Sequence, residues 1–180
     1  MAPAFPAGFF ERVPARPGQE EGKLDDAAVA ALRDLYGDLG IDGRVLDVGR
    51  SSADHFDFPP DELVAFGGDL DERLPYGDDA FDDALCSAAV GALTRPREAF
   101  EEIARVLRPG GRLICTFTGM LHVPGEVRGW VATDDAGRVR IVRSYFALAD
   151  AFGPAESDLR TSLTGSGDRL WAVWAAKRRL

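Results

Sequence analysis

Between residues 97 and 107, apolar residues recur at the spacing of a helix that buries one face. Charged side chains fill most of the positions between them, so the opposite face suits solvent. Pro96 fits the first turn of such a helix, and Pro109, Gly110 and Gly111 follow as residues that end one. The pattern predicts a helix over residues 97–107 whose buried face consists of Ala99, Phe100, Ile103, Ala104 and Leu107.

Two short apolar runs flank this helix, at residues 83–87 and 113–117. Each has the length of a strand and is bounded by turn residues, so both are predicted as buried strands. A strand, a helix and a second strand in this order form a right-handed crossover between parallel strands. Cys86 and Cys115 fall on these strands and are expected to be buried thiols rather than a disulfide framework.

The rest of the chain continues the alternation of strands and helices. Residues 159–163 and 170–176 are separated by a glycine-containing segment and predict a terminal hairpin. The second of these runs is apolar on both faces, which is typical of an interior strand. The further predicted elements are helices at 24–39, 124–132 and 139–152 and strands at 44–48 and 63–66. This order predicts an α/β three-layer sandwich with a mostly parallel sheet.

Residues 1–22 are rich in proline, glycine and alanine, which indicates an irregular arm ahead of a domain spanning residues 23–180. The arm also carries Phe5, Phe9 and Phe10, which make it too apolar for a solvated tail. We therefore expect these rings to pack on the domain. The alternative is a partly ordered terminus.

Length and composition limit the classes of protein. A chain of 180 residues, 46% of them apolar, suits one domain with a sizeable core. Its net charge of −9 argues against nucleic acid or an anionic membrane surface as a partner. No apolar run has the length of a membrane span and the first residues lack a secretory signal, so a cytoplasmic location is expected. No ligand spacing indicates a metal site.

The block from residue 74 to residue 119 carries a series of motifs in a fixed order. These are Leu74-Pro75-Tyr76, Asp79, Phe81-Asp82 and Arg105-Val106-Leu107-Arg108-Pro109-Gly110-Gly111. The block resembles the second half of the class I S-adenosylmethionine-dependent methyltransferase domain, of the methyltransferase type 11-like kind. The resemblance implies a Rossmann-like methyltransferase fold that is closed by an antiparallel strand of the terminal hairpin. It also implies S-adenosyl-L-methionine as cofactor and a small molecule as methyl acceptor.

The loop after the first predicted strand departs from this family, whose usual motif there is (D/E)-x-G-x-G-x-G. Asp47 and Gly49 match that motif, but Ser51 and Ala53 stand where two glycines would be. The sequence resembles a subgroup whose loop carries paired serines, here Ser51 and Ser52. The resemblance implies that the cofactor is contacted by Asp47, Gly49, Ser51 and Ser52. The serine hydroxyls could equally cap the following turn.

Three further side chains are candidates near the same edge of the sheet. Ser87 ends a predicted strand at its carboxyl edge, where open α/β sheets bind ligands, so it is a candidate cofactor contact. His55 belongs to the paired-serine motif and His122 follows the next predicted strand, and both are candidate substrate contacts. For His55 the alternative is a packed or solvent-facing ring.

The segment from residue 49 to residue 74 is short for this family. It has room for one strand where a complete domain has two, so one β-α unit is expected to be missing. Gly67-Gly68-Asp69-Leu70 resembles the motif after the family's third strand, which implies that Asp69 and Leu70 contact the adenine. If this strand is instead the second one, Asp69 or Asp71 could face the ribose. A charged turn without a ligand is the alternative.

Two classes of function follow. The ordered motifs favour a methyltransferase acting on a small molecule, a reaction that needs mainly the alignment of the two reacting groups. The altered loop and the short segment favour a non-catalytic binding or scaffold domain with a degenerate cofactor pocket. A third hypothesis is a homodimer whose partner supplies the missing pocket walls.

Overall fold

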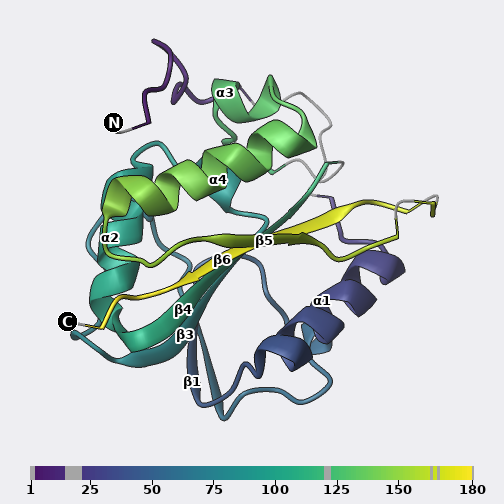
Figure 1. Ribbon diagram of the computed structural model, residues 1–180, viewed down its shortest axis with the longest axis vertical. Helices are drawn as coiled ribbons and strands as arrows, with labels where there is room; N and C mark the ends of the chain where they lie inside the picture. The colour runs from purple at the N-terminus through teal and green to yellow at the C-terminus, as the bar shows by residue number, and fades with distance from the viewer. Residues whose placement is uncertain (1–2, 15–21, 120–122, 163, 166, 180) are drawn as a thin grey trace.

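The computed structural model describes residues 3–14, 22–119, 123–162, 164–165 and 167–179. Six strands form a single sheet through the middle of the molecule (Figure 1). They are β1 (Arg44–Asp47), β2 (Glu62–Ala65), β3 (Phe81–Ser87), β4 (Leu107–Thr118), β5 (Glu156–Leu159) and β6 (Leu170–Ala176).

The sheet has the strand order β2-β1-β3-β4-β6-β5. The first four of these strands are parallel, whereas β6 runs antiparallel to β4 and β5 runs antiparallel to β6. Ile114 of β4 pairs with Leu85 on one side and with Trp174 of the reversed strand on the other. The predicted α/β sheet with an antiparallel hairpin strand in its interior is therefore confirmed.

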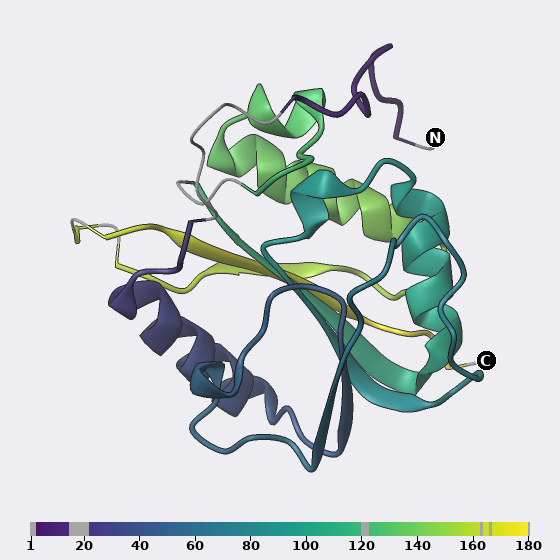
Figure 2. The ribbon, with the colours of Figure 1, turned by 180° about the vertical axis from the view of Figure 1, so that it is seen from behind.

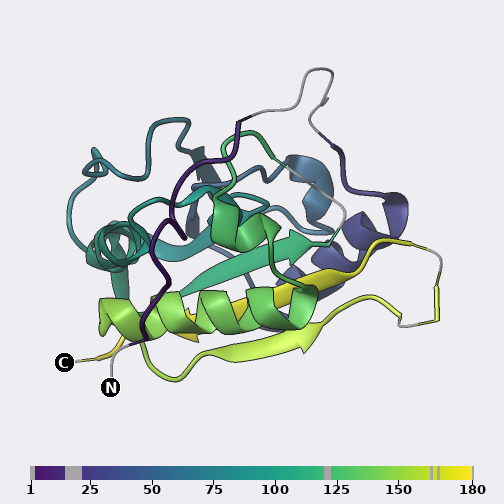
Figure 3. The ribbon, with the colours of Figure 1, turned by 90° about the horizontal axis from the view of Figure 1, so that it is seen from above.

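Helices cover both faces of the sheet. The helices are α1 (Asp26–Leu39), α2 (Pro96–Val106), α3 (Arg128–Val131) and α4 (Asp135–Ala149), with short 3-10 turns at η1 (Ala53–His55) and η2 (Val90–Ala92). One face packs on α1, which buries Leu32 and Leu35 in a cluster with Leu85 of β3. The other face packs on α2 and α4, and seen from above α4 runs alongside the C-terminal strands (Figure 3). None of the described helices is long and apolar enough to cross a membrane.

The boundaries differ from the prediction at the end of α2. The helix ends at Val106, and β4 begins at Leu107 rather than at residue 113. The Pro-Gly-Gly segment stays in the strand as an irregularity in its pairing with β3, with Gly110 at a φ of +84°. It is held by hydrogen bonds to Lys177: Gly110 N donates to the Lys177 carbonyl and Lys177 N donates to the Gly111 carbonyl. The glycine thus keeps a turn-like backbone conformation, while the contact with Lys177, distant in sequence, holds the segment in the sheet.

One strand, β2, lies between β1 and β3 in the chain, and it pairs in parallel with β1 at the edge of the sheet. Only η1 connects β1 to β2, so this segment contributes no long helix to either face. The expected loss of one β-α unit agrees with this topology. Because β2 is the direct neighbour of β1, the pairing favours the second-strand reading of this segment.

The described part of the N-terminal arm, residues 3–14, runs beside α3 (Figures 1 and 2). The rings of Phe5, Phe9 and Phe10 are partly buried against the core, and the Phe5 ring centroid lies 5.8 Å from that of Tyr145. The division of the chain at residue 22 stays a prediction.

Cys86 and Cys115 are paired in register on β3 and β4, and both are buried free thiols, as expected. Burial raises the pKa of the Cys115 thiol, so this residue behaves as a small apolar side chain rather than as a nucleophile.

Candidate functional site

The carboxyl ends of β1, β2 and β3 meet at one edge of the sheet, and a pocket of about 300 Å³ lies there. Open α/β sheets bind ligands at this edge, and the volume falls at the lower end of small-molecule sites. The pocket is lined by Arg12, Val48, Gly68, Asp69, Leu70, Asp71, Ala89, Ala92 and Leu93.

The segment after β2 supplies the polar wall of the pocket. Phe66 N donates to the Asp47 carbonyl at 2.8 Å, which carries the β1–β2 pairing up to this segment. Asp69 then closes a tight turn, since its Oδ1 accepts from Asp71 N at 2.9 Å and its carbonyl accepts from Glu72 N at 3.2 Å. Two predicted cofactor contacts, Asp69 and Leu70, therefore lie at the pocket.

The Asp71 carboxylate is held from the opposite side of the pocket. It accepts hydrogen bonds from the Thr94 hydroxyl and, at 3.1 Å, from Arg95 N. These contacts join the segment after β2 to the start of α2 and fix the outer rim of the pocket.

Asp47 is only 3% exposed and, unlike the next residue, Val48, is not part of the pocket lining. Its Oδ1 accepts from Gly49 N at 2.9 Å and its Oδ2 accepts from Ser51 N at 3.0 Å. Burial raises the pKa of Asp47, and these hydrogen bonds oppose the shift. In this arrangement Asp47 holds the loop that follows β1.

Gly49 is needed because the loop approaches β3 closely. A Cβ at this position would lie 2.4 Å from the nitrogen of Ser87 and 2.5 Å from its carbonyl oxygen. Arg50 N also donates to the Ser87 carbonyl at 3.0 Å, and Ser87 itself is buried. The glycine therefore allows protein backbone to pack against protein backbone at the base of the site.

The paired serines have different surroundings. Ser52 is exposed and forms reciprocal bonds with His55: His55 N donates to the Ser52 carbonyl at 3.0 Å, and Ser52 N donates to His55 Nδ1 at 3.3 Å. The His55 ring is 8% exposed. This geometry favours a turn-capping role for Ser52 and a packed ring for His55, and their proposed ligand contacts stay predictions.

Ser51 Oγ points into the protein, where it is buried and has no hydrogen-bond partner among the described residues. The same holds for the hydroxyls of Tyr36 on α1 and Thr116 on β4. Burial raises the pKa of Tyr36, while the nearby Ser51 and Thr116 hydroxyls counteract the shift. Three hydroxyls thus lie close together between α1 and the sheet, and none of these residues is part of the pocket lining.

We expect the free energy of unfolding to depend on pH because His55 is buried. Burial lowers the pKa of His55, Arg33 adds to the effect, and Asp47 and Asp54 oppose it. Between an unfolded pKa of about 6.5 and the lower native pKa, the unfolded chain binds a proton that the native protein does not, so stability falls as the pH falls. His55→Gln should flatten this slope in urea unfolding between pH 5 and pH 7.

The raised pKa of Asp47 acts in the opposite direction at lower pH, because there the native protein takes up the proton first. The contribution of His55 to the pH dependence of unfolding is therefore measured above the pH range in which carboxylates titrate. An NMR titration that places the pKa of His55 at or above 6.5 would contradict the expectation.

One predicted site residue could not be placed, and several residues of the pocket lining were not predicted. His122 lies outside the described residues. Arg12, Ala89 and Ala92 line the pocket but were not predicted, since none of them lies in a recognisable motif. Among the described residues, no group of three or more His, Cys, Asp or Glu is placed to hold a metal ion.

A larger hollow, of about 400 Å³, lies beside the C-terminal half of α1 and is lined in part by Tyr36, Phe56 and Phe58. It borders the turn that leads into β1, so it faces the amino ends of the parallel strands. The smaller pocket is the better candidate, because it lies where ligands bind in this architecture and contains predicted site residues.

Comparisons with known proteins agree with this assignment of the fold. A family model described as "Methyltransferase domain" matches residues 39–115. The ubiquinone/menaquinone biosynthesis C-methyltransferase UbiE of Roseobacter denitrificans is 35% identical over 101 residues, which are 56% of this chain and 37% of that protein. The chain thus spans little more than a third of that relative's length.

Two solved structures share the fold at low sequence identity. The Burkholderia thailandensis 1,6-didemethyltoxoflavin-N1-methyltransferase, solved with 1,6-didemethyltoxoflavin and S-adenosylhomocysteine, has a TM-score of 0.56 at 18% identity, over 86% of this chain and 80% of that one. A SAM-dependent methyltransferase from Aquifex aeolicus has a TM-score of 0.57 at 14% identity. The match covers 85% of this chain and 94% of that one.

Proposed function

We propose, from the premise that this chain belongs to the class I methyltransferase family, that it binds S-adenosyl-L-methionine and transfers the methyl group to a small molecule. The observation that carries the proposal is the pocket at the carboxyl edge of β1, β2 and β3, with Asp69 and Leu70 in its lining. The sequence alone predicts both residues as cofactor contacts.

The chemistry of the lining suits a nucleoside. Val48, Ala89 and Leu93 offer an apolar wall to a base, and the exposed Asp69 carboxylate can accept hydrogen bonds from hydroxyl or amino groups. Since β2 pairs directly with β1, this pairing supports Asp69 as a partner of the ribose hydroxyls rather than of the adenine. The cofactor, when bound, supplies an activated methyl group.

The protein's contribution to transfer is positional. Asp47 and Gly49 fix the loop at the base of the pocket, and Asp71 fixes its rim. Holding two reacting groups in line lowers the barrier without a catalytic acid or base. A methyltransferase of this kind therefore needs a rigid pocket more than it needs a reactive side chain.

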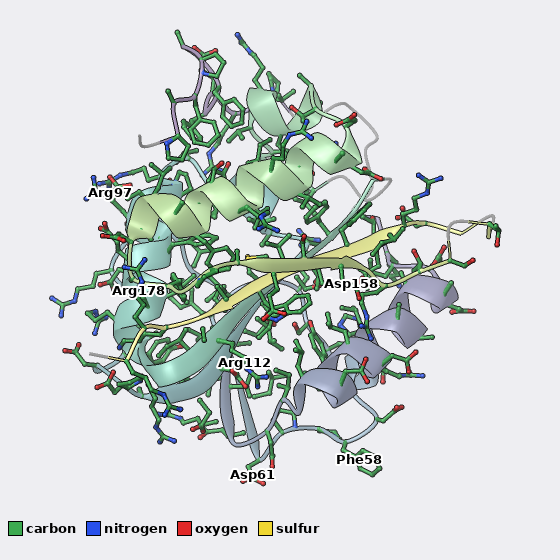
Figure 4. All side chains as sticks on the ribbon, in the orientation of Figure 1. Phe58, Asp61, Arg97, Arg112, Asp158 and Arg178 are labelled. Carbon is green, nitrogen blue, oxygen red and sulfur yellow. The ribbon has the colours of Figure 1, made fainter. Side chains whose placement is uncertain are left out.

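Calorimetry with S-adenosylhomocysteine tests the proposal. Asp69→Ala should weaken binding by roughly tenfold to a hundredfold, the range expected when a charged hydrogen-bond acceptor is lost. Asp61→Ala is the matched control, because it removes the same charge from an exposed residue that precedes β2 and is not part of the pocket lining. Asp61 lies at the lower edge of the molecule (Figure 4). No binding to the unmodified protein at millimolar ligand would refute the proposal.

A second candidate is a non-catalytic binding or scaffold domain with a degenerate cofactor pocket. The observation in its favour is that both Asp47 oxygens are occupied by loop amides, with Ser51 and Ala53 in place of glycines. Production of S-adenosylhomocysteine from S-adenosyl-L-methionine in the presence of a small-molecule extract separates the two. Turnover that is lost in Asp69→Ala would exclude the non-catalytic candidate.

A homodimer is compatible with both candidate functions. β2 is an edge strand and its segment borders the pocket, so a second copy packed there could close the site. Sedimentation at the concentration used for binding tests this, and a monomer that binds the ligand fully would exclude it.

A further inference from the structure

The backbone on both sides of Arg12 is fixed by the segment that leads into α3. Arg12 forms an isolated antiparallel bridge with Val127, and Val13 N donates to the Glu126 carbonyl at 2.9 Å. On the other side, Arg128 N donates to the Glu11 carbonyl at 2.8 Å. These bonds, together with the packed rings of the arm, determine where the Arg12 side chain can reach.

The Arg12 guanidinium reaches the rim of the pocket. Its Nη2 lies 3.8 Å from Asp71 Oδ2, a long ion-pair distance, and Asp71 already accepts hydrogen bonds from Thr94 and Arg95. The side chain is 49% exposed. An exposed pair at this distance contributes little to stability, so the contact with Asp71 alone does not explain the placement.

Gly125 provides the space for this side chain. A Cβ at Gly125 would lie 2.8 Å from Arg12 Nη1, and the residue has a φ of +83°, which favours glycine. The guanidinium therefore rests between the Gly125 backbone and the Asp71 carboxylate, as part of the pocket lining.

The rest of the lining determines what this guanidinium can bind. Val48, Ala89 and Leu93 are apolar and suit a flat ring, whereas Asp69 is the proposed partner of the ribose hydroxyls. Guanidinium groups stack on aromatic faces, and Arg does so better than Lys because it is planar and weakly hydrated.

We propose that Arg12 of the N-terminal arm is a ligand-binding residue of this pocket, where its guanidinium stacks on the purine base of the bound nucleoside. The proposal rests on the proposed function for the identity of the ligand. It makes the arm a wall of the site, so that residues 3–14 contribute to affinity as well as to packing.

Calorimetry with S-adenosylhomocysteine and with adenosine tests the role of Arg12. Arg12→Ala should weaken both ligands by the same factor, about fivefold to thirtyfold, since both carry the base. Arg12→Lys should weaken them comparably, because an ammonium keeps the charge but not the plane. Arg128→Ala is the matched control, since Arg128 forms an exposed ion pair with Glu11 of the same arm outside the pocket lining, and its affinity should stay within twofold.

Each result has one meaning. Unchanged affinity in Arg12→Ala, full affinity in Arg12→Lys, or an equal loss in Arg128→Ala would overturn the stacking role. A loss for S-adenosylhomocysteine but not for adenosine would assign the guanidinium to the ligand's carboxylate and also overturn it. Absence of binding by the unmodified protein would refute the proposed function itself, which separates the two failures. Thermal unfolding of each variant verifies that the fold is intact.

Discussion

Replacing Phe100 by alanine is expected to lower the free energy of unfolding by about 3–5 kcal/mol. Phe100 of α2 is fully buried, and its ring centroid lies 4.9 Å from that of Phe146 and 5.8 Å from that of Tyr145, both on α4. The ring therefore joins two helices on one face of the sheet. Its removal forfeits the burial of an aromatic side chain and leaves a cavity between rigid neighbours. Urea unfolding followed by circular dichroism measures the loss.

Phe58→Ala provides the matched control. The Phe58 ring is 88% exposed and projects to solvent at the lower edge of the molecule (Figure 4). The same substitution there should change the free energy of unfolding by no more than about 0.5 kcal/mol. A loss below about 1 kcal/mol for Phe100→Ala would contradict the packing described for α2 and α4.

Periodicity predicts Phe100 as a core residue because the helical stripe is a local property of the sequence. The end of the same helix was predicted to within one residue, but the start of β4 at Leu107 was not, because Gly110 and Gly111 are held in the strand by hydrogen bonds to Lys177. The N-terminus of α4 shows the same limit: its cap is Asp134, whose side chain accepts from Gly137 N, ahead of the predicted start at residue 139. Helices and strands with a clear hydrophobic pattern were predictable. Their ends depend on hydrogen bonds to side chains or to residues distant in sequence, which the pattern does not contain.

The candidate site likewise contains residues that a motif predicts and residues that only the tertiary structure reveals. Asp69 lies in a motif and was predicted to be at the site, and it lines the pocket. Asp47 also lies in a motif, but its carboxylate is held by the amides of Gly49 and Ser51 and is not part of the pocket lining. Arg12 could not be predicted from its surroundings in sequence, because its position depends on pairing with Val127, more than a hundred residues away. Motifs thus predict which strands' ends form the site, and tertiary pairing decides which side chains face it.

Asp83→Ala is expected to destabilise the protein by about 3–5 kcal/mol through a different mechanism, the loss of one partner in a buried ion pair. The Asp83 side chain is 6% exposed, and its two oxygens accept from Arg112 Nε at 2.9 Å and from Arg112 Nη2 at 2.6 Å. Arg112 N donates to the same carboxylate at 2.9 Å, and its Nη1 donates to the Leu39 carbonyl at the end of α1. The pair thus ties β3, β4 and α1 together at the amino end of the sheet.

The interaction can be isolated by a double-mutant cycle, since Arg112→Met retains much of the side-chain volume without the charge. If the cost of Asp83→Ala comes mainly from the charge left behind on Arg112, the double variant should be more stable than Asp83→Ala alone. Glu101→Ala is the control, because the Arg97–Glu101 pair on α2 is exposed and should contribute about 0.5 kcal/mol or less. Equal losses for Asp83→Ala and Glu101→Ala in urea unfolding would mean that burial does not strengthen the Asp83 pair, which would contradict the geometry at Arg112.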